Sequence, residues 1–119
     1  MTEHMVLGKK GEELAVVWLQ DHGFEILEKN WRNAHCEIDI VALKGGIPHF
    51  IEVKTRQWTP RPIHPEENVT RTKIRSLLKA ANGYLNYRKV FKDFRMDILS
   101  IILHNTAEPE YYFIEDVYL

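Results

Sequence analysis

The Gly45–Gly46 pair is the feature of this sequence that most restricts its fold. Apolar and polar residues alternate on both sides of the pair, so the two glycines predict a tight turn between two antiparallel strands. In such a hairpin Lys44 faces Ile47, and each earlier residue of the first strand faces the residue equally far beyond the turn. Asp39 is therefore predicted to lie opposite Glu52.

The hydrophobic pattern along the rest of the chain predicts two helices and further strands. Helical spacing marks Leu7–His22 and a segment that begins at about Thr70. Strand spacing marks the segments 24–31, 36–43, 50–56, 96–103 and 111–117. Three of the five prolines lie between residues 57 and 69, which predicts a loop. This order predicts an α/β sandwich in which a mixed sheet of about five strands is flanked by helices.

Composition limits the classes to which the protein can belong. A chain of 119 residues has the length of one domain, and residues 1–119 are predicted to form one. With 45% hydrophobic and 28% charged residues, the composition excludes a disordered chain and a coiled coil. Apolar runs are far shorter than the roughly 20 residues of a membrane span. With a single cysteine and no secretory signal, we expect a cytoplasmic protein without membrane contact.

The predicted hairpin places two carboxylates side by side. Opposed Cβ atoms lie about 4.5–5.5 Å apart, so Asp39 and Glu52 would repel one another unless a cation lay between them. Carboxylate oxygens without clustered His or Cys favour Mg²⁺ or Mn²⁺. Lys54 follows two residues later on the same face. Its side chain could orient a water that attacks a phosphodiester, or deprotonate that water when the amine is neutral.

Two structural interpretations compete with a metal site. Pro48 lies in the returning strand and can force a bulge, which would turn Asp39 away from Glu52. The same register also places Glu37 opposite Lys54, so an ordinary cross-strand ion pair explains part of the pattern. The spacing alone leaves a structural hairpin and a metal site both open.

Charge is segregated along the chain. Residues 1–53 carry five Lys or Arg against nine Asp or Glu, residues 54–95 carry eleven against three, and residues 96–119 carry none against five. An electropositive face of this kind suits a polyanion such as nucleic acid, although a solvated helix face explains the same count. The residues expected to contact nucleic acid lie at the end of the strand that contains Glu52 or at the start of the second helix. They are Arg56, Arg71, Lys73 and Arg75.

Several short motifs occur in a defined order along the chain. The central one is Asp39 followed by Glu52-Val53-Lys54. The others are Gly8–Ala15, Asn30–Arg32, Glu37–Ala42, Phe50–Arg56, a spaced pattern in the second helix, and Arg95–Asp97. Together they resemble the motifs of the YraN-like family of restriction-endonuclease-like nucleases, which is related to archaeal Holliday-junction resolvases.

The resemblance implies a restriction-endonuclease-like fold and a role for each matching residue. Lys54 would act on the attacking water, and Glu12 would approach the metal from the first helix. Arg95 joins the residues expected to contact nucleic acid. The family usually has glycine where this chain has Cys36, which leaves every implied ligand in place. The ligands implied for Mg²⁺ or Mn²⁺ are Asp39, Glu52 and the carbonyl of Val53.

Two functions of different classes follow from these observations. The first is a metal-dependent endonuclease that acts on DNA, including branched or junction DNA. The second is a catalytically silent nucleic-acid-binding or assembly module on the same scaffold. The intact set of Asp39, Glu52 and Lys54 favours the enzyme. Because cutting two antiparallel strands requires two sites related by two-fold symmetry, we expect a homodimer.

Overall fold

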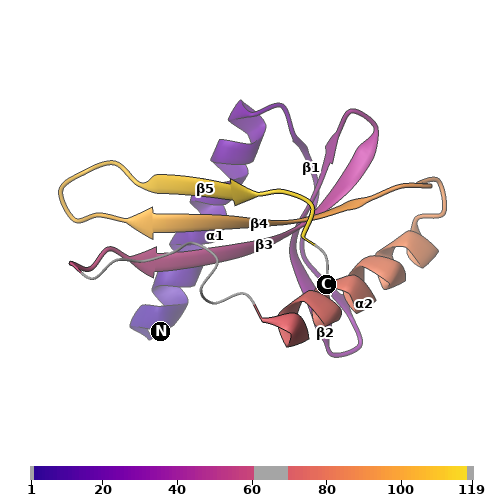
Figure 1. Ribbon diagram of the computed structural model, residues 1–119, viewed down its shortest axis with the longest axis horizontal. Helices are drawn as coiled ribbons and strands as arrows, with labels where there is room; N and C mark the ends of the chain where they lie inside the picture. Colours follow the sequence, from indigo (N-terminus) through magenta and orange to yellow (C-terminus); the bar gives the residue numbers. More distant parts are fainter. Residues whose placement is uncertain (1, 61–69, 118–119) are drawn as a thin grey trace.

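The computed structural model describes residues 2–60 and 70–117 (Figure 1). In chain order its elements are α1 (Glu3–Asp21), β1 (Glu25–Asn33), β2 (Cys36–Lys44), β3 (Ile47–Gln57), α2 (Arg71–Tyr87), β4 (Arg95–Leu103) and β5 (Glu110–Ile114). This is the order that the hydrophobic pattern predicts. Most of the predicted proline-rich loop, residues 61–69, lies outside the described residues. Neither α1 nor α2 has the length and apolar content of a membrane span.

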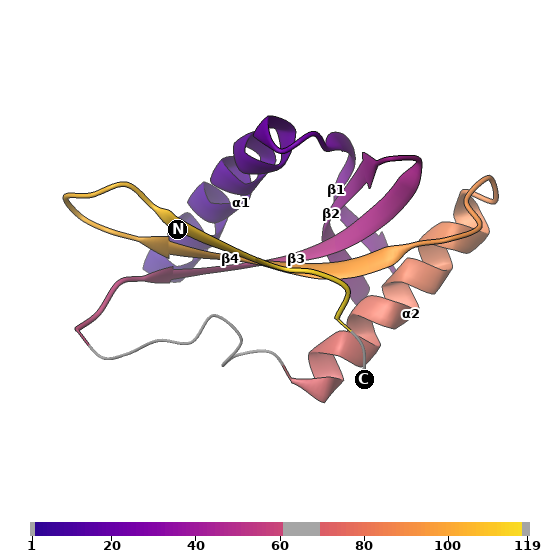
Figure 2. The ribbon, with the colours of Figure 1, turned by 45° about the horizontal axis from the view of Figure 1, so that its top comes forward.

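The strands form one mixed sheet in the order β1-β2-β3-β4-β5. β3 and β4 are parallel, whereas the other neighbouring pairs are antiparallel. A parallel pair requires a crossover connection, and α2 lies within it. Figure 2 shows α1 above the sheet and α2 below it. The predicted α/β sandwich, with helices flanking a mixed sheet of five strands, is confirmed.

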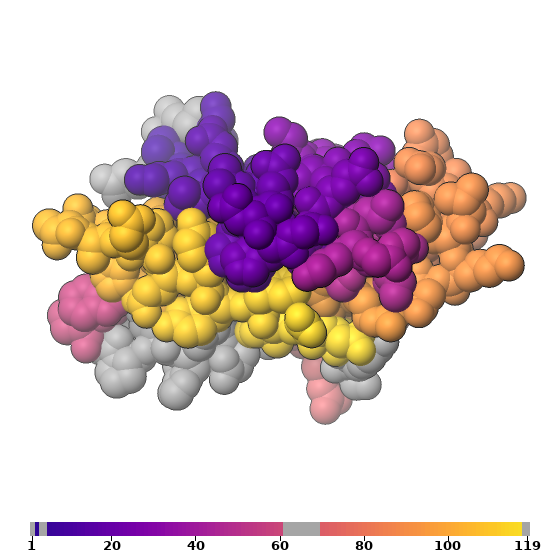
Figure 3. All heavy atoms as spheres, turned by 90° about the horizontal axis from the view of Figure 1, so that it is seen from above, coloured from indigo at the N-terminus to yellow at the C-terminus, as the bar shows by residue number. Residues whose placement is uncertain are grey.

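Each helix buries an apolar face against its own side of the sheet. On the α1 side, Ala15 and Leu19 pack against strand residues that include Ile51. Seen from that side, α1 lies between β5 and the segment that includes β1 and the β2–β3 turn (Figure 3). On the α2 side, the helix packs against strand residues that include Phe50. Since successive strand residues point to opposite faces, Glu52 lies on the α2 side with Phe50.

The glycine turn forms as predicted. Gly45 and Gly46 have φ values of 61° and 77°, which glycine adopts without steric strain. β2 and β3 then pair without a shift, from Lys44 opposite Ile47 to Ile40 opposite Ile51. The predicted register is therefore confirmed over these pairs.

Pro48 does not interrupt this ladder. It pairs directly with Leu43, and no bulge shifts the register of β2 against β3. Pairing between β3 and β4 begins only at His49, so the N–H that proline lacks has no ladder position to fill on that side. The described register shift lies in β1 instead, between Ile26 and Glu28.

β2 and β3 separate immediately beyond the pair formed by Ile40 and Ile51. β2 continues in pairing with β1, while β3 continues in pairing with β4. In Figure 1, β1 and β2 accordingly run steeply across the view, whereas β3, β4 and β5 follow its long axis. We call this point of separation the fork; it is formed by Asp39 on β2 and by Glu52 and Val53 on β3.

The last strand is shorter than predicted, because β5 ends at Ile114 and does not reach Val117. Asp116 has a φ of 56°, and its N–H donates to a carboxylate oxygen of buried Asp97 at 2.8 Å. The other oxygen of Asp97 lies 2.5 Å from Nδ1 of His49. The hydrogen bond to this buried carboxylate thus turns the chain away from the direction of β5 after Ile114.

α1 approaches β3 closely at Gly11. A Cβ atom built on Gly11 would lie 1.7 Å from Oγ1 of Thr55 and 2.7 Å from its Cβ. Both distances are far below van der Waals contact, and the short branched side chain of threonine has little freedom to move away. Only glycine therefore permits this contact, which fixes the position of the next residue, Glu12.

We predict that Gly11→Ala lowers the free energy of unfolding by about 1–3 kcal/mol, the usual range for an overpacked core. Gly8→Ala is the matched control, since a Cβ at Gly8 meets nothing within 4 Å. Alanine favours a helix over glycine by about 1 kcal/mol, so the control should be at least as stable as the unmodified protein. Urea denaturation measures both. Equal stability of the two variants would contradict the close packing of α1 on β3.

Candidate active site

The fork leaves one backbone N–H of β3 without a ladder partner on β2, and Asp39 supplies the acceptor. In a continued ladder Val53 would lie opposite Ile38, but its N–H donates to Oδ2 of Asp39 at 2.8 Å. In an antiparallel strand the N–H and the carbonyl of one residue point to the same side, so the Val53 carbonyl also faces the fork. Asp39 and Glu52 occupy the first position beyond the ladder, where Asp39 reaches across to β3.

The charged form of Asp39 is disfavoured. Burial is the largest cause that raises its pKa from 3.8 to about 7. The hydrogen bond from Val53 acts in the opposite direction, while the negative charges of Glu52, Glu12 and Glu37 raise the pKa further. The carboxylates of α1, β2 and β3 therefore repel one another at the fork. A cation placed among them would relieve this repulsion.

Glu52 and Lys54 project together on the α2 side of β3. Nζ of Lys54 lies 3.3 Å from Oε1 of Glu52, and both side chains are half-buried. They line a pocket with Ile74 and Leu77 of α2 and with Ile98 of β4. We call it the lysine pocket. Most of its apolar lining comes from α2, which lies on this face of the sheet because it is part of the crossover connection between β3 and β4.

The hairpin register predicts an ion pair between Glu37 and Lys54, and this prediction is wrong because each residue has another partner. An oxygen of Glu37 lies 3.8 Å from a guanidinium nitrogen of Arg32 on β1, while Lys54 pairs with Glu52. The physical reason is the fork, because β2 has already left β3 where Glu37 occurs. A plain ion pair across the hairpin therefore does not explain the charges at this site.

Asn30 links the first helix to the fork. In the orientation that satisfies both carboxylates, its amide nitrogen donates to Oε1 of Glu12 at 3.1 Å and to Oε1 of Glu37 at 3.3 Å. Its backbone has a φ of 52°, a left-handed value that asparagine tolerates better than most residues. Asn30 belongs to one of the sequence motifs, which alone indicates no role for it. Its contacts join separate elements, so no local pattern reveals them.

A second lysine reaches the lysine pocket from α2. Lys73 lies in the first turn of the helix, where its N–H donates to Oγ1 of the capping residue Thr70 at 3.1 Å. The side chain of Lys73 lines the same pocket as Glu52 and Lys54. The Lys54 nitrogen, within hydrogen-bonding reach, lowers the pKa of Lys73, and burial lowers it further; the carboxylates of Glu52 and Asp39 act in the opposite direction. Lys73 is predicted as a nucleic-acid contact, and its place beside this pocket is not visible in the sequence.

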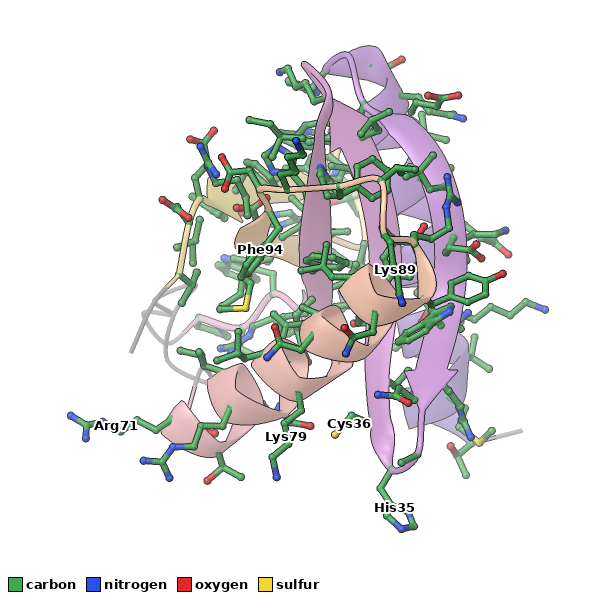
Figure 4. All side chains as sticks on the ribbon, turned by 90° about the vertical axis from the view of Figure 1, so that its right-hand side faces the viewer. His35, Cys36, Arg71, Lys79, Lys89 and Phe94 are labelled. Atoms are coloured by element: carbon green, nitrogen blue, oxygen red, sulfur yellow. The ribbon has the colours of Figure 1, made fainter. Side chains whose placement is uncertain are left out.

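The other basic residues expected to contact nucleic acid lie outside the fork. Arg71 and Arg75 are exposed on α2, and Figure 4 shows Arg71 pointing away from the sheet. Arg56 is half-buried on β3, two residues beyond Lys54 and on the same face. These three residues can extend a basic surface from the pocket along α2 and β3.

Arg95 is not brought to the fork. It begins β4 and pairs with His49, whereas the strand partner of Lys54 is Ser100. Its guanidinium lies 2.9 Å from the Asp93 carboxylate and 2.9 Å from the Phe94 carbonyl. A contact between Arg95 and nucleic acid remains a prediction, and it would lie at the other end of the parallel strand pair.

The donors at the fork suit a hard divalent cation. They are carboxylate and carbonyl oxygens, which Mg²⁺ and Mn²⁺ prefer. Within residues 2–60 and 70–117, no three His, Cys, Asp or Glu side chains come close enough to enclose an ion. The available set is therefore two carboxylates, from Asp39 and Glu52, with the carbonyl of Val53. Mg²⁺ usually keeps several waters and takes few protein ligands, so an open set of this kind fits it.

The fold and the fork define an α/β protein whose acidic and basic residues meet where a mixed sheet divides. The chain belongs to the uncharacterised protein family UPF0102, whose family model matches residues 11–101. This match confirms the resemblance to the YraN-like family drawn from the motifs.

Relatives in this family resemble the chain over most of its length. A UPF0102 protein of Bacteroides fragilis is 42% identical over 102 residues, which cover 86% of this chain and 84% of the relative. One of Christiangramia forsetii is 42% identical over 118 residues, covering 99% and 98%. Among solved structures, the Holliday junction resolvase Hjc of Archaeoglobus fulgidus aligns with a TM-score of 0.49 at 20% identity, covering 87% of this chain and 74% of that one.

We predict that Asp39→Asn stabilises the metal-free protein at neutral and alkaline pH. Because the folded pKa of about 7 exceeds the ordinary value of 3.8, the stabilising contribution of Asp39 is complete below about pH 4 and is lost as the pH rises through 7. Asparagine keeps an oxygen that can accept from Val53 but never becomes charged. Its advantage should therefore be absent near pH 4, grow up to pH 7 and then stay constant.

Thermal melts in the presence of a chelator measure this effect. A gain of about 1 kcal/mol would raise the melting temperature at pH 8 by roughly 4 °C in a domain of this size. Glu25→Gln, which removes an exposed carboxylate at the start of β1, is the control and should show no such trend. A shift of equal size at every pH would contradict the assignment to Asp39.

Proposed function

We propose that this protein is a metal-dependent endonuclease that hydrolyses phosphodiester bonds in DNA. One observation carries the proposal: the fork holds Asp39 against the Val53 N–H at 2.8 Å, directly beside the Glu52–Lys54 pair at 3.3 Å. Oxygen ligands for a cation and an ammonium group for water or phosphate are thus present at one point of the sheet. The motif resemblance to restriction-endonuclease-like nucleases supports the same function.

Asp39, Glu52 and the Val53 carbonyl are the groups that would hold Mg²⁺ or Mn²⁺. When bound, such an ion supplies Lewis-acid chemistry that polarises a phosphoryl oxygen. Glu12 adds negative charge to the fork from α1, as its effect on the pKa of Asp39 indicates. The Asn30 amide, which donates to Glu12, holds this carboxylate in place.

The residues of the chain account for the remaining chemistry. In the hydrolysis, a water oxygen bonds to phosphorus as the bond from phosphorus to the leaving sugar oxygen breaks. The water loses one proton and the leaving oxygen gains one, so no further reactant is needed. We assign to Lys54 the role of orienting the attacking water, because Lys54 lines the lysine pocket and its Nζ is held 3.3 Å from Oε1 of Glu52.

The charge distribution supports nucleic acid as the substrate. Residues 54–95, which run from the end of β3 through α2, carry eleven Lys or Arg against three Asp or Glu. Arg71 and Arg75 on α2 would contact phosphates beside the site, and such contacts release counterions and weaken with salt. A two-fold dimer belongs to the proposal as well, since it would present two sites to the two strands of a duplex or junction.

We predict that Lys54→Ala reduces cleavage of DNA by at least about 100-fold, the range for loss of a positioned acid–base group. Affinity for DNA should stay within a few-fold, because one ammonium among many basic residues adds little to the summed field. The measurement is cleavage of duplex, single-stranded and four-way-junction DNA with Mg²⁺ or Mn²⁺, beside binding in Ca²⁺. Lys79→Ala is the control, since Lys79 points away from the sheet in Figure 4.

The outcome separates the two candidate functions. Cleavage by the unmodified protein that depends on metal and on Lys54 supports the enzyme. Cleavage that survives Lys54→Ala would contradict the assignment of this residue. DNA binding by the unmodified protein without any cleavage would make the catalytically silent binding module the better account.

We also predict that Mg²⁺ raises the melting temperature of the protein at pH 8. An ion that binds only the folded state stabilises it by about 2.7 kcal/mol at a concentration 100 times its dissociation constant. Asp39→Asn should abolish this increase, although it stabilises the metal-free protein. Glu25→Gln should leave the increase intact, and NaCl of equal ionic strength should not reproduce it. An increase that persists in Asp39→Asn would place the ion elsewhere.

A further inference from the structure

Among the described residues, two lysines and one acidic residue, Glu52, line the lysine pocket. Lys54 enters it from β3 and Lys73 from the first turn of α2, and the two nitrogens come within hydrogen-bonding reach. Glu52 lies 3.3 Å from Lys54 and can neutralise one of the two charges. Apolar side chains of Ile74 and Ile98 form much of the rest of the wall. Asp39 also favours the charged form of Lys73, but burial disfavours ionisation of Asp39 itself, so the pocket keeps a share of positive charge for an anion.

Two ammonium groups held this close repel one another unless an anion lies between them. Arg71, Lys73 and Lys79 are all exposed, and Figure 4 shows Arg71 and Lys79 pointing away from the sheet. Lys73 differs from them because it also lines the pocket, beside the buried residues Ile74 and Leu77 of α2. The position of Lys73 thus favours an anion that contacts both lysines at once.

We propose that Lys54 and Lys73 together bind the non-bridging oxygens of the scissile phosphodiester, so that Lys73 is a catalytic residue and not a general DNA contact. This inference rests on the proposed function and extends it by naming the two residues that bind the scissile phosphate. With a cation at the fork and the phosphate between the two lysines, cation and anion are neighbours on β3. The ammonium of Lys73 then stabilises the negative charge that develops on the phosphate as water attacks.

The test compares Lys73→Met and Lys73→Arg with Lys79→Met, which removes the same charge from the outward side of the same helix. Lys73→Met should reduce cleavage by about 100-fold or more, as loss of a charge-stabilising donor does. Its affinity for duplex DNA in Ca²⁺ should remain within a few-fold of the unmodified protein. Lys73→Arg should restore part of the cleavage because it retains the charge, and Lys79→Met should cleave normally.

A second measurement does not depend on cleavage. Thymidylyl-thymidine contains a single phosphodiester, and its binding in Ca²⁺ can be followed by amide chemical-shift titration. Lys73→Met should weaken this binding at least several-fold, whereas Lys79→Met should not change it. Melting temperatures at or above that of the unmodified protein would show that each variant folds, because both side chains are exposed and Lys73→Met also removes the repulsion from Lys54.

The two measurements distinguish failure of this inference from failure of the proposed function. If the unmodified protein binds the dinucleotide through Lys73 but never cleaves DNA, the phosphate site stands and the enzyme proposal fails. If cleavage occurs but Lys73→Met cleaves and binds like Lys79→Met, the inference is overturned and the enzyme proposal stands. No binding of the dinucleotide by the unmodified protein would also overturn the inference.

Discussion

The hydrogen bond from the Val53 N–H to Asp39 is the interaction on which the candidate site depends. It replaces a ladder bond that β2 would otherwise supply, and so lets β2 and β3 part without leaving a backbone donor unpaired. The same separation leaves the Val53 carbonyl, which points to the side of β2, without a ladder partner on that strand. A continuous ladder would pair this carbonyl with a backbone N–H instead of leaving it for an ion.

The charged groups at the fork destabilise the protein when no ligand is bound. Burial and neighbouring carboxylates oppose ionisation of Asp39, and the close approach of Lys54 opposes that of Lys73. Each group would be relieved by a ligand of opposite sign, and the two relieving ligands would lie side by side. Shifted pKa values of this kind cluster at functional sites, where burial and neighbouring charges are arranged together.

Much of the fold follows from local patterns, whereas the fork does not. The turn at Gly45 and the alternation around it predict the register of β2 and β3 correctly as far as Ile40. Where the strands part depends on how α1 and α2 pack and twist the sheet, which are contacts between distant segments. Glu37 is misassigned for this reason. The place of Lys73 depends on the crossover connection, whose length is visible in the sequence but whose path is not.

The two helices contribute to the site from opposite faces of the sheet. α1 is held on β3 by the contact of Gly11 with Thr55 and brings Glu12 near Asp39, while α2 brings Lys73 to the pocket lined by Glu52 and Lys54. Substitutions in one helix can therefore alter its own contribution and leave the packing of the other intact. During divergence of such a scaffold, affinity for a polyanion and the ability to cut it can be lost or kept independently.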